Sequence, residues 1–181
     1  MVYKVVRYLN SPILERPARD VTEFDTPELH ILIDDMFETM YASHGIGLAA
    51  PQIDVAQRVT VIDIAGADAG DDDAEHPRAP ERIVLINPEI VSKEGKQTGE
   101  EGCLSIPGFR EPVTRARKTV VRARNAKGEP IEIAGEALLA RAFQHEIDHL
   151  NGVLFINHLS ALKRDLIKRK IRKLQKAGEW E

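Results

Sequence analysis

The segment from residue 136 to residue 150 constrains this chain more than any other. Its apolar residues recur at helical spacing and are followed by an Asn-Gly pair, which is typical of a helix C-terminus, so the pattern predicts a helix. His145 and His149 are four residues apart and therefore share one face of that helix. Both imidazoles can point at one metal ion. Glu146 completes an H-E-x-x-H pattern, in which the carboxylate moves protons of the activated water.

A catalytic metal needs a third protein ligand and an open position. One common continuation of the pattern puts a histidine where this chain has Phe155, and the only later glutamates, Glu179 and Glu181, lie near the end of the sequence. His158 is the remaining downstream candidate. Cys103, the single cysteine, is the better one, because a thiolate beside two imidazoles suits a borderline or soft divalent metal. A lone cysteine also cannot form an internal disulfide.

The remaining patterns predict a single α+β domain over residues 1–181, with no repeat and no interdomain linker. Helices are expected over residues 26–45, 136–150 and 160–176, where helical apolar spacing follows plausible N-caps. Strands are expected at residues 58–65 and 82–91, with Asn87-Pro88 as a break, and a hairpin over residues 119–135 that turns at Asn125 to Gly128. The acidic segment 66–80 is expected to be a mobile loop that packs no core.

Charge and hydropathy narrow the class of protein. The formal net charge of −4 gives no sign of DNA binding. The sequence has no apolar run of about 18 residues that would predict a membrane span. The first ten residues lack the long apolar core of a signal peptide. We therefore expect a cytoplasmic enzyme or binding protein with neither membrane nor DNA as a partner.

Three motifs together resemble those of the peptide deformylases. They are GIGLAAPQ (residues 45–52), EGCLS (residues 101–105) and QHEIDHLNG (residues 144–152), and they occur in the order typical of that family. The resemblance spans nearly the whole chain. It implies a compact domain with antiparallel or mixed sheets around a central metal-binding helix, flanked by N-terminal and C-terminal helices. It also implies that the chain removes the formyl group from the N-terminal formylmethionine of newly synthesised polypeptides.

The resemblance further implies a role for each matching residue. The metal ligands would be Cys103, His145 and His149. One divalent ion is implied, natively Fe²⁺, with Zn²⁺, Ni²⁺ or Co²⁺ able to occupy the site. Glu146 would be the general base and acid, while Gln52 and the backbone N–H of Leu104 would stabilise the oxyanion. Metal-bound hydroxide is expected to attack the formyl carbon and release formate.

Residues beside these motifs are candidates for substrate binding. They are Ile46, Gly47, Gly102, Arg110, Leu138, Arg141 and Ala142. An extended peptide is expected to pair with the backbone at Ile46 and Gly47. Leu138 and Ala142 lie on the stripe of the helix that faces the site and are expected to form a wall of the methionine pocket. Arg141 shares that stripe and is expected to reach solvent at the rim. Arg141 and Arg110 are equally compatible with a solvated surface.

Two other functions remain open from the sequence, and so does the role of the last helix. A metallopeptidase would cleave internal peptide bonds, but it lacks a convincing downstream ligand. A structural metal site would normally have four protein ligands, and it would leave Glu146 without a task. The segment 162–176 carries eight basic residues and one acidic residue, with an apolar side. This basic amphipathic helix would either contact ribosomal RNA or dock with a solvated face.

Overall fold

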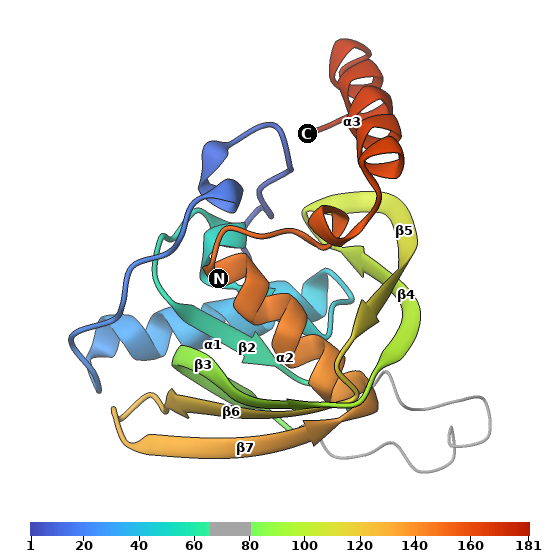
Figure 1. Cartoon of the computed structure of the whole chain (residues 1–181). Coiled ribbons are helices and arrows are strands. Elements are labelled where there is room, and N and C mark those ends of the chain that lie inside the picture. Colours follow the sequence, from blue (N-terminus) through green and yellow to red (C-terminus); the bar gives the residue numbers. More distant parts are fainter. Residues whose placement is uncertain (66–80) are drawn as a thin grey trace, which may run out of the picture.

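The structure, a computed structural model, describes residues 1–65 and 81–181 (Figure 1). The expected acidic loop, residues 66–80, lies outside the described residues. The helices are α1 (Pro27–Ala42), α2 (Ala137–Leu150) and α3 (Ala161–Lys176), with short 3-10 helices η1 (Pro12–Glu15), η2 (Ala50–Ile53) and η3 (Phe155–His158). The strands are β1 (Gly47–Ala49), β2 (Val59–Ile62), β3 (Ile83–Glu94), β4 (Gln97–Cys103), β5 (Ile106–Arg115), β6 (Lys118–Arg124) and β7 (Pro130–Glu136).

The described strands form two antiparallel sheets. One has five strands in the order β1-β2-β3-β6-β7, and the other is the two-stranded β4–β5 hairpin. In Figure 1, α2 lies at the centre of the fold, above the five-stranded sheet and beside the hairpin. It contacts β1, β2, β6 and β7. The α+β class predicted from the sequence is confirmed.

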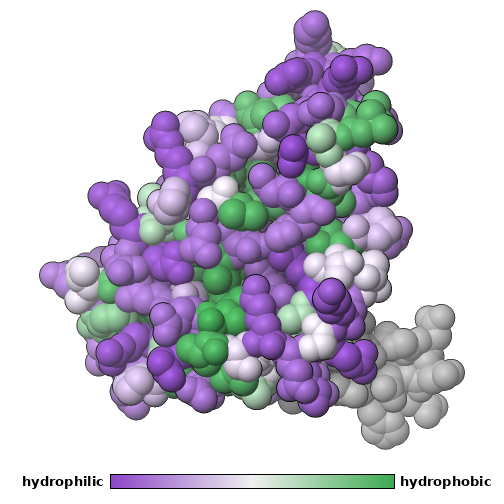
Figure 2. Space-filling view, viewed as in Figure 1, coloured by the Kyte–Doolittle hydropathy of each residue, from purple (hydrophilic) through white to green (hydrophobic). Residues whose placement is uncertain are grey.

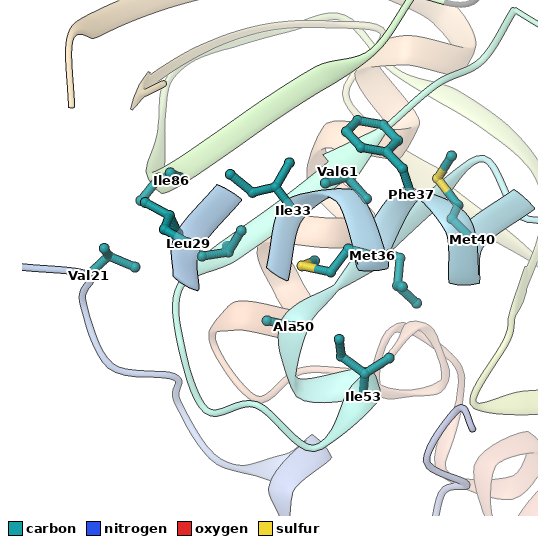
Figure 3. Close-up of a cluster of buried hydrophobic side chains, with 12 residues drawn as sticks. Val21, Leu29, Ile33, Met36, Phe37, Met40, Ala50, Ile53, Val61 and Ile86 are labelled. Carbon is teal, nitrogen blue, oxygen red and sulfur yellow. The ribbon is translucent and has the colours of Figure 1, made fainter. Parts of the chain in front are cut away.

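Helix α1 buries one apolar face against the large sheet. Thr26 caps its start by accepting a hydrogen bond from the backbone N–H of Leu29, and proline occupies the first helical position. Apolar side chains at helical spacing then meet Val61, Ile86 and Ile53 (Figure 3). Those of α1 are Leu29, Ile33, Met36, Phe37 and Met40. Burying each such side chain contributes about 1.5–3 kcal/mol, so this face fixes α1 on the sheet.

A second apolar cluster joins the two ends of the described chain. It includes Tyr8, Leu14, Ile106, Phe155, Ile171 and Trp180, all of them buried. Helix α3 starts after Ser160, whose side chain accepts a hydrogen bond from the backbone N–H of Lys163. Its outer surface is mostly hydrophilic, with Leu162 and Leu166 among the exposed apolar residues (Figure 2). No helix within residues 1–65 and 81–181 is long and apolar enough to cross a membrane.

Several boundaries differ from the sequence-based predictions. Helix α1 ends at Ala42 rather than Gly45, and the left-handed residue is His44, with φ of 56°. The Gly45 N–H still donates to the carbonyl of Met40, so glycine closes the turn without ending the helix. Strand β2, the first one expected from the sequence, covers only Val59–Ile62 of the expected segment 58–65.

The predicted break at Asn87-Pro88 is a bulge inside one continuous strand. Strand β3 shifts register between Ile86 and Glu89, and Asn87 has φ of 49°. The bulge takes the proline, which has no N–H, out of the hydrogen-bond ladder. The Asn87 side chain accepts from the backbone N–H of Val21 and donates to its carbonyl, at 2.8 and 2.9 Å. These bonds attach the N-terminal segment to the sheet.

Candidate metal centre

The three predicted metal ligands lie together at the junction of α2 and β4. The ligand atoms of Cys103, His145 and His149 all lie within 4.8 Å of one another. The Cys103 sulfur is 3.3 Å from Nε2 of His149, and the ring centroids of His145 and His149 are 4.9 Å apart. His158, the alternative third ligand, instead lies with its Nε2 atom 2.8 Å from a carboxylate oxygen of Asp148. Cys103 is therefore the residue that completes the cluster.

A buried carboxylate orients one of the imidazoles. Oε1 of Glu101 lies 2.8 Å from Nδ1 of His145. Burial raises the pKa of Glu101, but hydrogen bonds from Arg115 and His145 outweigh it and hold the pKa well below the ordinary range. An ionised carboxylate only accepts, so Nδ1 of His145 carries the proton and donates it. Nε2 of His145 is left as the atom that can bind a metal.

Two arginines neutralise the charge of Glu101. Arg115 forms a two-pronged contact with both carboxylate oxygens, at 2.9 Å each, and also donates to Asp148. Arg141 donates to Oε2 of Glu101 at 2.6 Å and to the carbonyl of Val113 at 3.0 Å. Such buried, charge-assisted pairs need full hydrogen bonding to offset their desolvation, and this network supplies it.

The prediction that Arg141 reaches solvent at the rim is therefore wrong. Its exposed fraction is 9%, and its guanidinium points inward to Glu101. The sequence shows Arg141 on the site-facing stripe of α2, but it does not show the partner carboxylate that the β4–β5 hairpin brings there.

The electrostatics favour the thiolate form of Cys103. Burial would raise the pKa of the thiol, but the charges of His149 and His145 and their hydrogen bonds lower it to about 5. The same contacts act in reverse on His145: burial would lower its pKa, yet Cys103 and Glu101 raise it well above the ordinary value. The thiolate is the form that binds metals.

Glu146 lies beside the cluster with one free carboxylate oxygen. It is buried, and burial raises its pKa despite the opposing charges of the two histidines. Its Oε2 atom and Nδ1 of His149 have no hydrogen-bond partner among the described residues. Its other oxygen lies against Gly47, where an added Cβ would come within 2.4 Å of Oε1. Glycine at position 47 is therefore what leaves room for this carboxylate.

Gln52 and Leu104, which the resemblance pairs as oxyanion donors, both lie beside Cys103. Gln52 is buried, and its amide nitrogen is 3.6 Å from the Cys103 sulfur and 3.2 Å from the hydroxyl of Ser105. Its oxygen accepts from the backbone N–H of Ala49 at 2.9 Å. This bond sets the direction of the amide, so its NH₂ group faces the cluster.

One cavity of about 640 Å³ joins these groups. Every predicted substrate-binding residue lines it: Ile46, Gly47, Gly102, Arg110, Leu138, Arg141 and Ala142. Glu101, Ile106 and Phe109 also line it but were assigned no role from the sequence. All three belong to the β4–β5 hairpin, where the sequence analysis predicts no strand. Its glycines and acidic residues are unfavourable for strands, so the strand signal was weak.

Comparisons with known proteins agree on one class of enzyme. A family model described as polypeptide deformylase matches residues 2–165. The chain is 57% identical to a peptide deformylase of Acidobacterium capsulatum over 180 residues, covering 99% of both sequences. A crystal structure of a peptide deformylase from Legionella pneumophila is 45% identical, covers 100% of this chain and 99% of that chain, and gives a TM-score of 0.85. A crystal structure of the plant peptide deformylase PDF1B is 36% identical and gives a TM-score of 0.84. The match covers 98% of this chain and 91% of the plant chain.

The fold, the cavity and these similarities define a hydrolase of the metalloenzyme type. More particularly, the chain belongs to the polypeptide deformylase family.

Proposed function

We propose that residues 1–181 form one catalytic domain that removes the formyl group from the N-terminal formylmethionine of newly synthesised polypeptides. One observation carries the proposal: the buried carboxylate of Glu146, with a free oxygen, lines the same cavity as the Cys103 and His145 side chains. A structural metal site would not need that carboxylate. The family membership supports the same reaction.

The donor set fits one divalent metal held by Cys103, His145 and His149. A thiolate and two imidazoles within 4.8 Å of one another suit Fe²⁺, Zn²⁺, Ni²⁺ or Co²⁺, and we propose Fe²⁺ as the native ion. Three protein ligands leave a position open, as in catalytic sites. When bound, the metal would act as a Lewis acid that polarises the formyl group and lowers the pKa of water.

Glu146 then handles the protons of the reaction. It accepts a proton from the water that attacks the formyl carbon, so that a C–O bond forms and the carbonyl oxygen gains negative charge. It next gives this proton to the amide nitrogen as the C–N bond breaks. The products are formate and a free N-terminal methionine. Burial raises the pKa of Glu146, which favours holding the proton between the two steps.

The developing oxyanion would be stabilised by the side-chain amide of Gln52 and the backbone N–H of Leu104. Donors of this kind act best when their positions are fixed before the reaction. The Gln52 amide is oriented by its hydrogen bond from the backbone N–H of Ala49. Gln52 and Leu104 both line the cavity. We propose that they bind the formyl oxygen as it becomes negative.

The substrate would enter as an added strand along β1. This strand is at the edge of the five-stranded sheet, which supports pairing of an extended peptide with the backbone of Gly47 and of Ile46 just before it. Leu138 and Ala142 of α2 would wall the pocket for the methionine side chain. Arg110 would lie at the mouth, where its side chain is 63% exposed.

Two residues of the predicted substrate set would act indirectly. Gly102 lies beneath Arg110, and a Cβ there would come within 3.1 Å of the guanidinium. Glycine thus leaves space for that side chain over the cavity. Arg141 would serve the site by neutralising Glu101 rather than by binding peptide.

Helix α3 is proposed to contact ribosomal RNA in the cytoplasm, where nascent chains emerge. Its basic residues include Lys168, Arg169, Lys170 and Arg172, and a cationic face binds the phosphate backbone. Charge reversal at these four positions should abolish co-sedimentation with ribosomes. Unchanged co-sedimentation would rule out this contact, leaving a docked helix with a solvated face.

The reaction is tested by formate release from formyl-Met-Ala-Ser with anaerobically purified protein. We expect release by the parent and little release by Cys103→Ala, which should also lose metal. Cleavage of internal peptide bonds without formate release would indicate a metallopeptidase instead.

A further inference from the structure

The backbone of the N-terminal segment binds Gln52, one proposed oxyanion residue, and Ser105, which follows the other, Leu104. The N–H of Val6 donates to the carbonyl of Gln52 at 2.8 Å. Two residues later, the N–H of Tyr8 donates to the carbonyl of Ser105 at 2.9 Å. Gln52 and Ser105 are 2% and 0% exposed, so these bonds are made inside the protein. The segment therefore connects η2 to the turn between β4 and β5.

Arg7, between Val6 and Tyr8, forms a hydrogen bond with Leu104 itself. Its Nη1 atom donates to the Leu104 carbonyl at 2.6 Å. A charged donor makes a stronger hydrogen bond than a neutral one. Each peptide group is planar, so fixing the carbonyl of Leu104 fixes the plane of the peptide that follows it. The Leu104 N–H belongs to the preceding peptide, between Cys103 and Leu104. Cys103 is restrained by its pairing with Ile106 and the Leu104 carbonyl by Arg7, so the direction of this N–H is restrained from both sides.

That direction matters for catalysis. An oxyanion donor works only within a narrow range of distances from the developing charge, and a displacement of about 1 Å can lower the rate about 100-fold. Leu104 and Ser105 form the turn between β4 and β5, outside the ladder, whose last pair is Cys103 with Ile106. The bonds from residues 6–8 supply the support that the ladder lacks.

The last residues of the described chain hold Arg7 in turn. Nε of Arg7 donates to the main-chain oxygen of Glu181 at 3.0 Å. Trp180 is 5% exposed, and its indole N–H donates to the carbonyl of Tyr8 at 2.7 Å. Its ring also packs edge-on against Phe109, with 6.1 Å between centroids, and Phe109 lines the cavity. The guanidinium is thus held between the catalytic turn and the segment that follows α3.

We propose that Arg7 is a positioning residue for the oxyanion-binding N–H of Leu104, and that Trp180 and Glu181 keep Arg7 in place. Arg7 touches no substrate atom in this account. It acts through the Leu104 carbonyl, and the inference rests on the proposed deformylase function. Because its effect is on the transition state, it should appear in kcat and not in KM.

The first test compares Arg7→Ala, Arg7→Lys and the control Arg122→Ala. Arg122 lies on β6 with a 59% exposed side chain and two surface ion pairs. We expect Arg7→Ala to lower kcat for formyl-Met-Ala-Ser roughly 10-fold to 100-fold, with KM within about twofold and metal content unchanged. Arg7→Lys should recover part of the loss, since lysine can still donate to the carbonyl. The control should match the parent. Equal kcat values for Arg7→Ala and the parent would overturn the proposal.

Hydrogen exchange provides a readout that does not depend on activity. In Arg7→Ala, the amides of residues 103–105 should exchange faster, while those of α2 should keep the parent rate. Unchanged exchange at residues 103–105 would contradict the positioning role even if the parent releases formate. If the parent releases no formate but Arg7→Ala still exchanges faster than the parent at residues 103–105, the proposed reaction is refuted. The positioning of this turn by Arg7 then still holds.

A double-mutant cycle tests the link to Trp180. Trp180→Ala should lower kcat less than Arg7→Ala does. It should have little further effect when combined with Arg7→Ala, because both residues act on the Leu104 N–H. Fully additive effects would show that Trp180 does not work through Arg7.

Discussion

Oε1 of Glu101 lies 2.8 Å from Nδ1 of His145, and this contact links the two motifs that build the candidate metal centre. It ties the EGCLS segment to helix α2 and leaves Nε2 of His145 free for a metal. Carboxylate partners of this kind set the tautomer and orientation of metal-binding histidines. The arrangement predicts that Glu101 contributes to metal affinity without binding the metal.

Glu101→Gln should weaken metal binding. The neutral amide cannot hold the His145 proton as a carboxylate does, and Arg115 and Arg141 would lose their charge partner. We expect the dissociation constant for Zn²⁺, measured by chelator competition, to rise about 10-fold to 100-fold. Glu100→Gln is the matched control, since its side chain is 66% exposed and pairs only loosely with Arg110. Equal affinities for the two variants would contradict the assigned role.

Arg115→Met should strongly destabilise the fold. It removes the two-pronged partner of a buried carboxylate and the donor to Asp148, so that Glu101 keeps only Arg141 and His145 to offset its buried charge. Breaking a buried pair in this way costs about 3–5 kcal/mol. The loss should be seen as a lower free energy of unfolding in urea. A change below about 1 kcal/mol would show that the network relaxes or hydrates readily.

Gly47→Ala should impair catalysis more than metal binding. The added methyl group would lie 2.4 Å from Oε1 of Glu146, so the carboxylate must move from its position. We expect kcat to fall at least about 10-fold, because a misplaced proton-transfer group loses most of its advantage, with metal content near that of the parent. In a Glu146→Ala background, the same change should have almost no effect on stability. A large additional destabilisation there would show that the clash is with the backbone.

The pair formed by Tyr41 and Asp63 predicts a pH-dependent contribution to stability. The Tyr41 hydroxyl donates to Asp63 at 2.6 Å. Burial alone would raise the pKa of Asp63, but this bond and backbone N–H donors lower it. Burial and Asp63 together raise the pKa of Tyr41 to about 12. A carboxylate with a lowered pKa stabilises the fold above its unfolded pKa and loses this contribution as the pH falls through the folded pKa.

Tyr41→Phe should therefore lower the free energy of unfolding by about 1 kcal/mol at pH 7. The contribution of this hydrogen bond is modest because Tyr41 is 44% exposed. The difference from the parent should shrink below about pH 4, where Asp63 begins to protonate in the unfolded state. Urea titrations at several pH values would measure it, with the surface variant Tyr3→Phe as the control. A difference that stays constant down to pH 2 would exclude the charged form of Asp63 as its source.

Much of the framework follows from local sequence signals. Thr26 and Ser160 cap α1 and α3 as expected, and the Asn125–Gly128 turn joins β6 to β7. The two histidines of the candidate metal cluster also follow, because the spacing of His145 and His149 is a local property of one helix. Cys103 could be added by considering what that helix lacked.

The remaining features depend on contacts between distant segments. Asn87 takes a left-handed conformation inside β3 because its side chain pairs with Val21, which is 66 positions away. Arg141 turns inward because Glu101 is held beneath it by the β4–β5 hairpin. The contact of Arg7 with Leu104 joins residues 97 positions apart. No local pattern encodes such pairs, since they exist only after the chain has folded.

The most direct test of the account is formate release by Glu146→Gln beside the parent, with both proteins loaded with the same amount of Ni²⁺. Glutamine keeps the shape of the side chain but cannot accept and return a proton. The account predicts that the variant retains its metal and loses at least about 1,000-fold in kcat. A metal-loaded variant that releases formate at a rate near that of the parent would contradict the central claim that Glu146 transfers the protons of the reaction.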